Sequence, residues 1–213
     1  MFVVKGLACK CLASVGATMK FLARLSRGGL GLLCVVLSGC SSQGGDTPQL
    51  PNMDVQSIMT EVGEQSCKKD FDKSDPNETP YLGCPGVAGY SLIVRRVEAG
   101  RQSIDVVDES QHAWPLNYQD YITPHMSSLD GKAEWRVATK DGKQVPIALI
   151  VRVQARENSA NPEKVTGTYI SVAKIGPTEM CVTARIPEGT KTEAEIHQIA
   201  DSAQQSQCVP AQP

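Results

Sequence analysis

Alternating apolar and polar residues through the middle of the chain predict β-strands. Apolar side chains stand at every second position from Tyr90 to Val94, and the same period returns at 103–106, after the turn signal Ala99-Gly100. Successive side chains of a strand point to opposite faces of a sheet, so this period is typical of a strand with one buried face. The two segments and the short turn between them predict a β-hairpin.

The segment 145–153 is apolar almost throughout and predicts a strand at the centre of a sheet. A strand of this kind needs apolar neighbours on both faces. Alternation divides its side chains into two sets, with Val145, Ile147, Leu149, Val151 and Val153 on one face and Ala148 and Ile150 on the other.

Two further hairpins are expected around this central strand. In 133–137 apolar residues alternate with charged ones, and the pair Asp141-Gly142 then gives a two-residue turn signal. The segments 168–175 and 180–186 also have the composition of strands and are separated by Gly176-Pro177, which predicts a second hairpin.

Helix signals occur at two places. We expect a short helix over 55–63. Near the C-terminus, Thr192 and Glu195 form a capping box, in which each side chain would bond a backbone N–H of the other residue. Apolar residues then recur at helical spacing, which predicts a helix that lies on the sheet. These residues are Ile196, Ile199, Ala200 and Ala203.

These elements together predict an α+β fold: a mostly antiparallel β-sheet with the C-terminal helix packed on it, in a single domain over 55–213. Within the domain, 67–84 is expected to be an acidic, turn-rich loop. His197 lies one position from the apolar stripe of the helix, where we expect a surface or boundary histidine.

The N-terminal segment is basic and contains no acidic residue. Five of the 21 lysines and arginines lie in the first 39 residues, which hold none of the 23 aspartates and glutamates. Basic residues after Met19, an uncharged run over 28–39 and small residues at its end are typical of a secretory signal. The run is 12 residues long, whereas a stable transmembrane helix needs about 20. We expect 1–39 to be a removable signal peptide, with Met19 as a candidate start.

The motif Leu37-Ser38-Gly39-Cys40 at the end of this run resembles the lipobox of bacterial lipoproteins. The resemblance implies diacylglycerol on the Cys40 thiol, cleavage before this residue and acylation of the new amine. Two or three acyl chains hold a protein on a membrane far more firmly than one. Because Ser41 stands where an Asp often directs inner-membrane retention, the resemblance implies an outer-membrane location facing the periplasm. The alternative is a secreted protein in which Cys40 follows Gly39 by chance.

Removal of the signal peptide changes the charge of the chain. The remaining 174 residues carry 16 basic and 23 acidic side chains, which gives 16 − 23 = −7. A negative protein repels the phosphates of nucleic acid, so we expect no nucleic-acid partner. The segment 40–54 begins with the lipidated cysteine and is rich in Gly, Ser and Pro, as expected for a flexible tether.

Four cysteines remain for the domain when Cys40 carries lipid, and an even number outside the cytoplasm indicates disulfides. Three pairings are possible, and we expect the two local ones because short loops need the least ordering. The sequence lacks a close Cys or His pair with the spacing of a zinc site, so we expect no metal and no cofactor. The expected disulfides join Cys67 to Cys84 and Cys181 to Cys208.

Several motifs make the domain similar to a group of small bacterial exported proteins that have no assigned activity. The resemblance spans about 65–208 and implies one cystine-containing domain without catalytic residues. The motifs that carry it are Cys-Pro-Gly-Val-Ala-Gly-Tyr at 84–90, Arg-Gln-Ser at 101–103, Gly-Lys-Ala-Glu-Trp-Arg at 131–136 and Pro-Ile-Ala-Leu-Ile-Val-Arg-Val at 146–153.

The segment 111–136 is the candidate binding surface. It concentrates aromatic and hydrogen-bonding side chains, which suit recognition of a peptide, glycan or protein. In the alternative interpretation, aromatic residues of this segment fold back and close one end of the sheet. Lys132, Glu134 and Arg136 are expected on the outward face of their strand, as a cross-strand charge ladder. The candidate residues are Trp114, Tyr118, Tyr121, His125 and Trp135.

The sequence contains none of the common catalytic or nucleotide-binding motifs. We therefore expect a non-enzymatic envelope lipoprotein that contacts membrane lipid through acylated Cys40 and another envelope protein or glycan through its domain. The acidic charge also suits a second hypothesis, an inhibitor or binder of a basic envelope enzyme such as a lysozyme. A third hypothesis, an enzyme, would need His125 and a carboxylate to converge in an open pocket.

Overall fold

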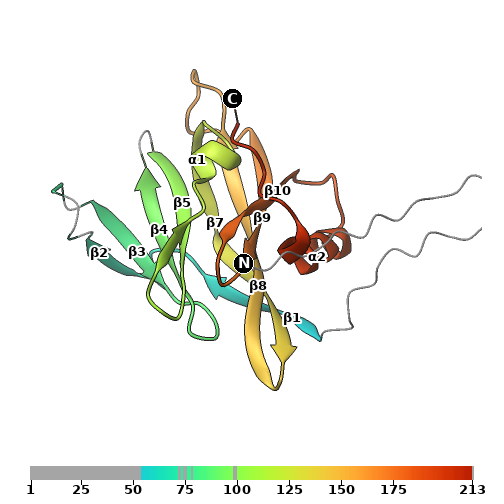
Figure 1. Cartoon of the computed structure of the whole chain (residues 1–213). Helices are drawn as coiled ribbons and strands as arrows, with labels where there is room; N and C mark the ends of the chain where they lie inside the picture. The colour runs from blue at the N-terminus through green and yellow to red at the C-terminus, as the bar shows by residue number, and fades with distance from the viewer. Residues whose placement is uncertain (1–53, 72, 74–75, 78, 98–99, 213) are drawn as a thin grey trace, which may run out of the picture. The chain divides into compact units, whose positions relative to one another are not determined.

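Two antiparallel β-sheets lie face to face, and one helix covers the outer face of the first (Figure 1). The computed structural model describes residues 54–71, 73, 76–77, 79–97 and 100–212. The predicted signal peptide 1–39, lipidated Cys40 and the tether as far as residue 53 lie outside the described residues. In the described part of the chain, no helix has the length and apolar character needed to cross a bilayer.

The first sheet has five strands in the order β1-β7-β8-β9-β10. All neighbouring strands in it are antiparallel. The central strand, β8, is therefore paired on both sides, as the sequence predicts for 145–153. The bounds are β1 (Val55–Glu61), β7 (Met126–Lys140), β8 (Lys143–Arg156), β9 (Gly167–Ile175) and β10 (Met180–Pro187).

The second sheet also has five antiparallel strands, in the order β2-β3-β4-β5-β6. Consecutive strands pair, so this sheet is a simple meander. Its strands are β2 (Lys68–Phe71), β3 (Pro80–Cys84), β4 (Ser91–Val97), β5 (Arg101–Val107) and β6 (Ala113–Pro115). The helices are α1 (Tyr118–Tyr121), α2 (Glu193–Asp201) and a final 3-10 turn, η2 (Ala203–Gln205).

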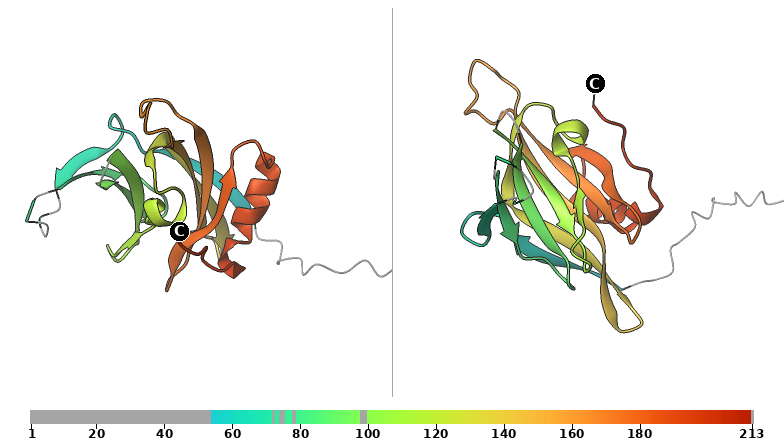
Figure 2. Two further views of the ribbon diagram at one scale, coloured as in Figure 1. Left: turned by 90° about the horizontal axis from the view of Figure 1, so that it is seen from above. Right: turned by 60° about the vertical axis from the view of Figure 1, so that its left-hand side comes forward.

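Two apolar layers hold these elements together. The larger layer fills the space between the sheets, and the smaller one lies between the first sheet and α2 (Figure 2). Strand β8 contributes to both, with Leu149, Val151 and Val153 in the first and Ala148 and Ile150 in the second. The predicted division of this strand is confirmed for these five residues, whereas Val145, close to the turn, is 39% exposed.

The fold class is confirmed in its main features and corrected in one. The domain is mostly antiparallel β-structure with a C-terminal helix and two disulfides, but the strands form two sheets and not a single one. Alternation within a segment reports which side chains share a face. It does not report which strands pair, because pairing is decided by contacts between distant segments.

The predicted helix over 55–63 is wrong, because Val55–Glu61 forms strand β1. This strand pairs along its whole length with β7, from Val55 opposite Ala138 to Glu61 opposite Lys132. A nine-residue helix is marginal by itself. The weak local preference for a helix is therefore outweighed by the pairing of seven residues with β7 and by the packing of Ile58 against the inter-sheet layer.

The segment 67–84 is likewise more regular than a loop, since β2 and β3 pair within it as a hairpin. The Cys67–Cys84 disulfide closes this hairpin at its base, with the two Cα atoms 4.3 Å apart. The predicted pairing of cysteines is confirmed here, and Cys181–Cys208 confirms the second pair.

The three expected hairpins are present as β4–β5, β7–β8 and β9–β10. Asp141 and Gly142 connect β7 to β8 with φ angles of 50° and 72°. Two consecutive positive φ angles define the turn that matches the twist of a hairpin, and Asp-Gly is a favoured pair for it. The capping box is confirmed too, with Thr192 and Glu195 bonded in both directions.

Candidate functional site

The five residues of the predicted binding surface lie on different elements and are mostly enclosed. Trp135, on β7, is fully buried between the sheets, and its indole N–H donates to Thr60 Oγ1 at 2.9 Å. Tyr118, at the start of α1, is 1% exposed, and burial raises the pKa of its phenol. Neither side chain can contact a ligand from the surface.

Trp114 on β6 and Tyr121 on α1 are half-buried and pack against the inter-sheet layer. Trp114 donates its indole N–H to Asp108 Oδ2 at 2.9 Å, and the His112 ring meets it edge to face. Ile122, which follows α1, is fully buried. This packing agrees with the alternative interpretation, in which the segment folds back over one end of a sheet.

Asp108 organises the turn before β6. Its carboxylate accepts hydrogen bonds from the Ser110 hydroxyl, the Trp114 indole and the backbone N–H of His112. These donors stabilise the ionised form and lower the pKa of Asp108 to about 2. The turn is therefore held by one carboxylate, which explains why His112 and Trp114 lie together without forming an open site.

His125 is the exposed member of the predicted set. It lies between α1 and β7, and its backbone N–H donates to Thr123 Oγ1 at 3.3 Å. The side chain belongs to neither of the two hollows described below. The described structure thus does not assemble the predicted residues into one surface.

A groove that sequence reasoning missed lies on the second sheet, on the face turned toward the first. Lys69 of β2, Leu82 of β3 and Val94 of β4 are side by side, because Lys69 pairs with Leu82 and Leu82 with Val94. The hollow over them has a volume of about 390 Å³. Strand β2 is exposed throughout, so the first sheet leaves this end of the second sheet uncovered.

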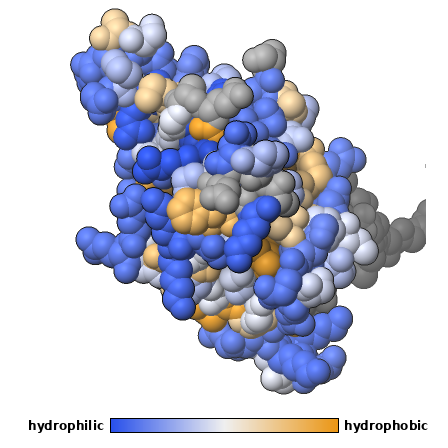
Figure 3. Space-filling model, turned by 90° about the vertical axis from the view of Figure 1, so that its left-hand side faces the viewer, coloured by the Kyte–Doolittle hydropathy of each residue, from blue (hydrophilic) through white to orange (hydrophobic). Residues whose placement is uncertain are grey.

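The floor of the groove is aliphatic and its rim is charged. Leu82 and Val94 form the floor, while Glu64, Lys69 and Arg96 stand around it. Glu64 and Arg96 form an ion pair at 3.5 Å, with side chains 78% and 70% exposed, so the pair adds little stability. Figure 3 views the molecule from the side of β2 and β3, where apolar patches lie among hydrophilic side chains.

The groove continues into a second hollow of about 240 Å³. Arg96 and Gln102 line both hollows, and Met126, which is 37% exposed, lines the second. The side chain of Gln102 is fixed at this junction, since its Oε1 accepts from the backbone N–H of Leu129 at 2.8 Å. The two hollows therefore adjoin at Arg96 and Gln102, and each has apolar side chains in its lining.

A second polar site lies beneath α2. Glu134 and Arg136 of β7 point to the face opposite Trp135, as predicted, but α2 covers them, so they are not an exposed ladder. Arg136 donates to both carboxylate oxygens of Asp201, at 2.7 and 2.9 Å. His197 lies between the buried and the exposed face of α2, as predicted, and its side chain is 26% exposed. Its Nε2 is 2.7 Å from Glu134 Oε1.

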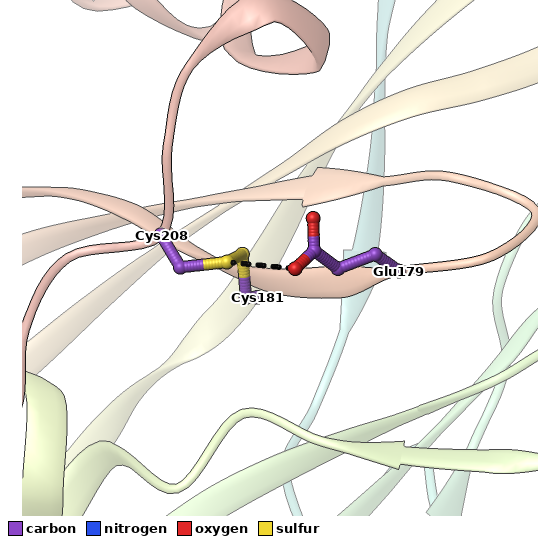
Figure 4. Close-up of side chains that lie close together, drawn as sticks. All are labelled: Glu179, Cys181 and Cys208. Atoms are coloured by element: carbon purple, nitrogen blue, oxygen red, sulfur yellow. Dashed lines mark hydrogen bonds between the residues drawn. A yellow bond between two sulfur atoms is a disulfide. The ribbon is translucent and has the colours of Figure 1, made fainter.

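A third group of potential ligands surrounds the second disulfide. Figure 4 shows Glu179 beside Cys181 and Cys208, with one carboxylate oxygen 3.4 Å from Cys208 Sγ. The two sulfur atoms are bonded to each other and carry no thiolate that could bind a metal. Glu179 instead pairs with the Nζ of Lys174 at 2.5 Å. This group is structural and joins the C-terminal segment to β10.

Comparisons with family models, with curated proteins and with solved structures found no match to this chain. The features of this chain that bear on function are the groove, the polar site beneath α2 and the sequence of the N-terminal segment.

Proposed function

We propose that the chain is a membrane-anchored envelope lipoprotein whose domain acts as a non-enzymatic binding module. The observation that carries the proposal is the groove on the second sheet, with its aliphatic floor and charged rim, together with the hollow that adjoins it at Arg96 and Gln102. An apolar depression bordered by charged side chains is a common form of docking site for a protein segment.

The lining of the groove favours a protein segment over a glycan. Sugar rings bind well against aromatic faces, but the floor residues Leu82 and Val94 are aliphatic. Tyr81 also borders the groove, but it is adjacent to Leu82 in β3, so its side chain is directed to the other face of the sheet, where Arg95 lies over the ring. The proposed ligand is therefore an extended segment with an apolar side chain for the floor and an acidic one for Lys69.

Charge reversal at the rim tests the groove. Lys69→Glu should reduce capture of the partner from solubilised envelope by at least about tenfold, because opposite charges at a rim guide association and like charges oppose it. Lys143→Glu makes the same charge change at the exposed start of β8 and serves as the matched control. Equal recovery of every captured protein by both variants would contradict a role for the groove.

The lipid anchor is tested by fractionation of cells. Cys40→Ala removes the thiol that the lipobox resemblance assigns to acylation, so the variant should move from the detergent phase to the soluble fraction. Continued partitioning of Cys40→Ala into detergent would contradict the anchor and leave the groove proposal unaffected.

The net charge of −7 after residue 39 supports a second candidate function, binding of a basic envelope enzyme such as a lysozyme. Long-range attraction of this type weakens as salt screens it. Capture of a muramidase at low salt, and its release as the ionic strength rises, would favour the inhibitor. Failure to retain any muramidase at low salt would exclude it.

A further inference from the structure

A group of metal-binding side chains lies between α2 and β7. Glu193 and His197 are four residues apart on α2, so their side chains share one face of the helix. Glu134 of β7 faces them, and the three ligand atoms all lie within 4.8 Å of one another. The helix and the strand thus bring one imidazole and two carboxylates together.

The contact between His197 and Glu134 differs from an ordinary hydrogen bond. Nε2 of His197 lies 2.7 Å from Oε1 of Glu134, yet this nitrogen is buried and has no hydrogen-bond partner among the described residues. A distance of 2.7 Å is short enough for a hydrogen bond, so the bond is absent because the N–H of the ring does not point at the oxygen. The N–H direction of this nitrogen therefore passes beside the oxygen, so the lone pair of a neutral imidazole is not used in a hydrogen bond to Glu134.

The charges around this group favour a divalent cation. Glu134, Glu193 and Asp201 are acidic and Arg136 is basic, so the ionised groups sum to −2 when the imidazole is neutral. Glu134 is only 9% exposed, and a buried carboxylate needs a compensating charge. Arg136 is already engaged with both oxygens of Asp201, which leaves Glu134 and Glu193 for the cation.

Neighbouring hydrogen bonds hold Glu134 in position. The Ser57 hydroxyl on β1 donates to Glu134 Oε1 and accepts from Nη1 of Arg136. Hydrogen bonds of this type, one step beyond the ligands, orient the ligands in metal sites. Glu134 is thus a rigid ligand on the sheet, and His197 is a second ligand on the helix. Glu193 is the third, and its side chain, which is 78% exposed, is free to adjust.

We propose that Glu134, Glu193 and His197 bind one Zn²⁺ ion that joins α2 to β7. Imidazole together with carboxylate suits zinc, whereas Ca²⁺ and Mg²⁺ prefer oxygen ligands alone. Tetrahedral zinc with bonds of about 2.0 to 2.2 Å holds two ligand atoms about 3.3 to 3.6 Å apart, which lies between the separations of 2.7 and 4.0 Å from His197 Nε2 to the two carboxylates. Zinc binding therefore requires the His197–Glu134 contact to widen and the exposed Glu193 side chain to move inward. Three protein ligands would leave a fourth position for water.

Titration of the metal-free lipoprotein with ZnCl₂ by calorimetry tests this site. The full chain, purified in detergent and treated with a chelator, should bind one equivalent. Glu193→Gln should weaken binding by at least about tenfold, and its exposed position makes a folding defect unexpected. Glu195→Gln is the matched control, because it removes a charge from the same helical turn and Gln retains the capping box.

His197→Ala should abolish stoichiometric binding and the rise in Tm that Zn²⁺ gives to the wild-type chain. His125→Ala changes an exposed histidine elsewhere and should leave both unchanged. The proposal is overturned if the wild-type chain binds no zinc, if Glu193→Gln and Glu195→Gln lose affinity equally, or if binding survives in Glu193→Gln and His197→Ala alike.

Discussion

Over residues 133–138, both faces of β7 are buried, but by different kinds of contact. On the inner face, Trp135 is fully enclosed between the sheets, with Ala133 and Val137 beside it. On the outer face, Glu134 and Arg136 are 9% and 7% exposed because α2 lies over them. Apolar contacts stabilise the first face, and ion pairs and hydrogen bonds stabilise the second.

This difference separates two contributions to the fold. Burial of apolar surface has no preferred direction and supplies much of the free energy of folding. A buried ion pair adds little net stability, since its desolvation offsets its attraction, but it is costly to break and its geometry is specific. The inner face of β7 therefore holds the sheets together, whereas the outer face fixes the position of α2.

Trp135→Ala should have the largest effect on stability. Removal of a large buried side chain loses its transfer free energy and leaves a cavity, and we expect a cost of about 3 to 5 kcal/mol in urea unfolding. Phe71→Ala removes an aromatic ring that is 45% exposed and should cost much less. Similar costs for the two variants would show that the inter-sheet layer does not depend on Trp135.

Loss of the Cys181–Cys208 disulfide should have the next largest effect. The bond closes a loop with a sequence separation of 27 and holds the segment after α2 against β10. The cross-link limits the conformations of the unfolded chain, and its removal in Cys181→Ala with Cys208→Ala is predicted to cost about 3.5 kcal/mol. Denaturation of this double variant beside the wild-type chain measures it, and an unchanged midpoint would contradict the estimate.

Arg136→Ala tests the outer face directly. It leaves Asp201 without its partner, and we expect a cost of about 2 kcal/mol, below the usual range for a buried pair because Asp201 is 31% exposed. Arg136→Met with Asp201→Asn removes both charges and should restore most of the stability. If the double variant is as unstable as the single one, apolar packing of the arginine stem and not charge is decisive.

Thr192→Ala should have the smallest effect, because it removes only the cap of α2. The hydroxyl accepts from the backbone N–H of Glu195, and loss of such a cap typically costs about 1 kcal/mol. Thr192→Ser keeps the hydroxyl and should be neutral. Thermal unfolding followed by circular dichroism can measure both, and equal losses would show that the hydroxyl is not responsible.

The parts of this fold that the sequence predicts are those fixed locally. Alternation assigns Leu149 and Ile150 to opposite faces of β8, and the Asp141-Gly142 turn, the capping box and the short disulfide loops each depend on neighbouring residues. The assembly of two sheets is not local. Strand β1 pairs with a strand more than 70 residues away, and that contact decides between helix and strand for 55–61.

The candidate sites could not be predicted for the same reason. The many aromatic residues in 111–136 indicate large apolar side chains, but their number does not show that Trp135 points into the core. Alternation places Glu134 and Arg136 opposite Trp135, but only the packing of α2 shows that this face is covered. The groove forms where the second sheet extends past the first, a feature of sheet geometry that local patterns do not contain.

Site-specific photo-cross-linking in living cells tests the central proposal, partner binding in the groove, most directly. A photoreactive residue replaces Lys69 at the rim in one variant and Lys143, at the start of β8, in another. The proposal predicts a discrete adduct from position 69 only, joined to an envelope protein segment that has an apolar residue next to an acidic one. No adduct from position 69, or the same adducts from both positions, would contradict it.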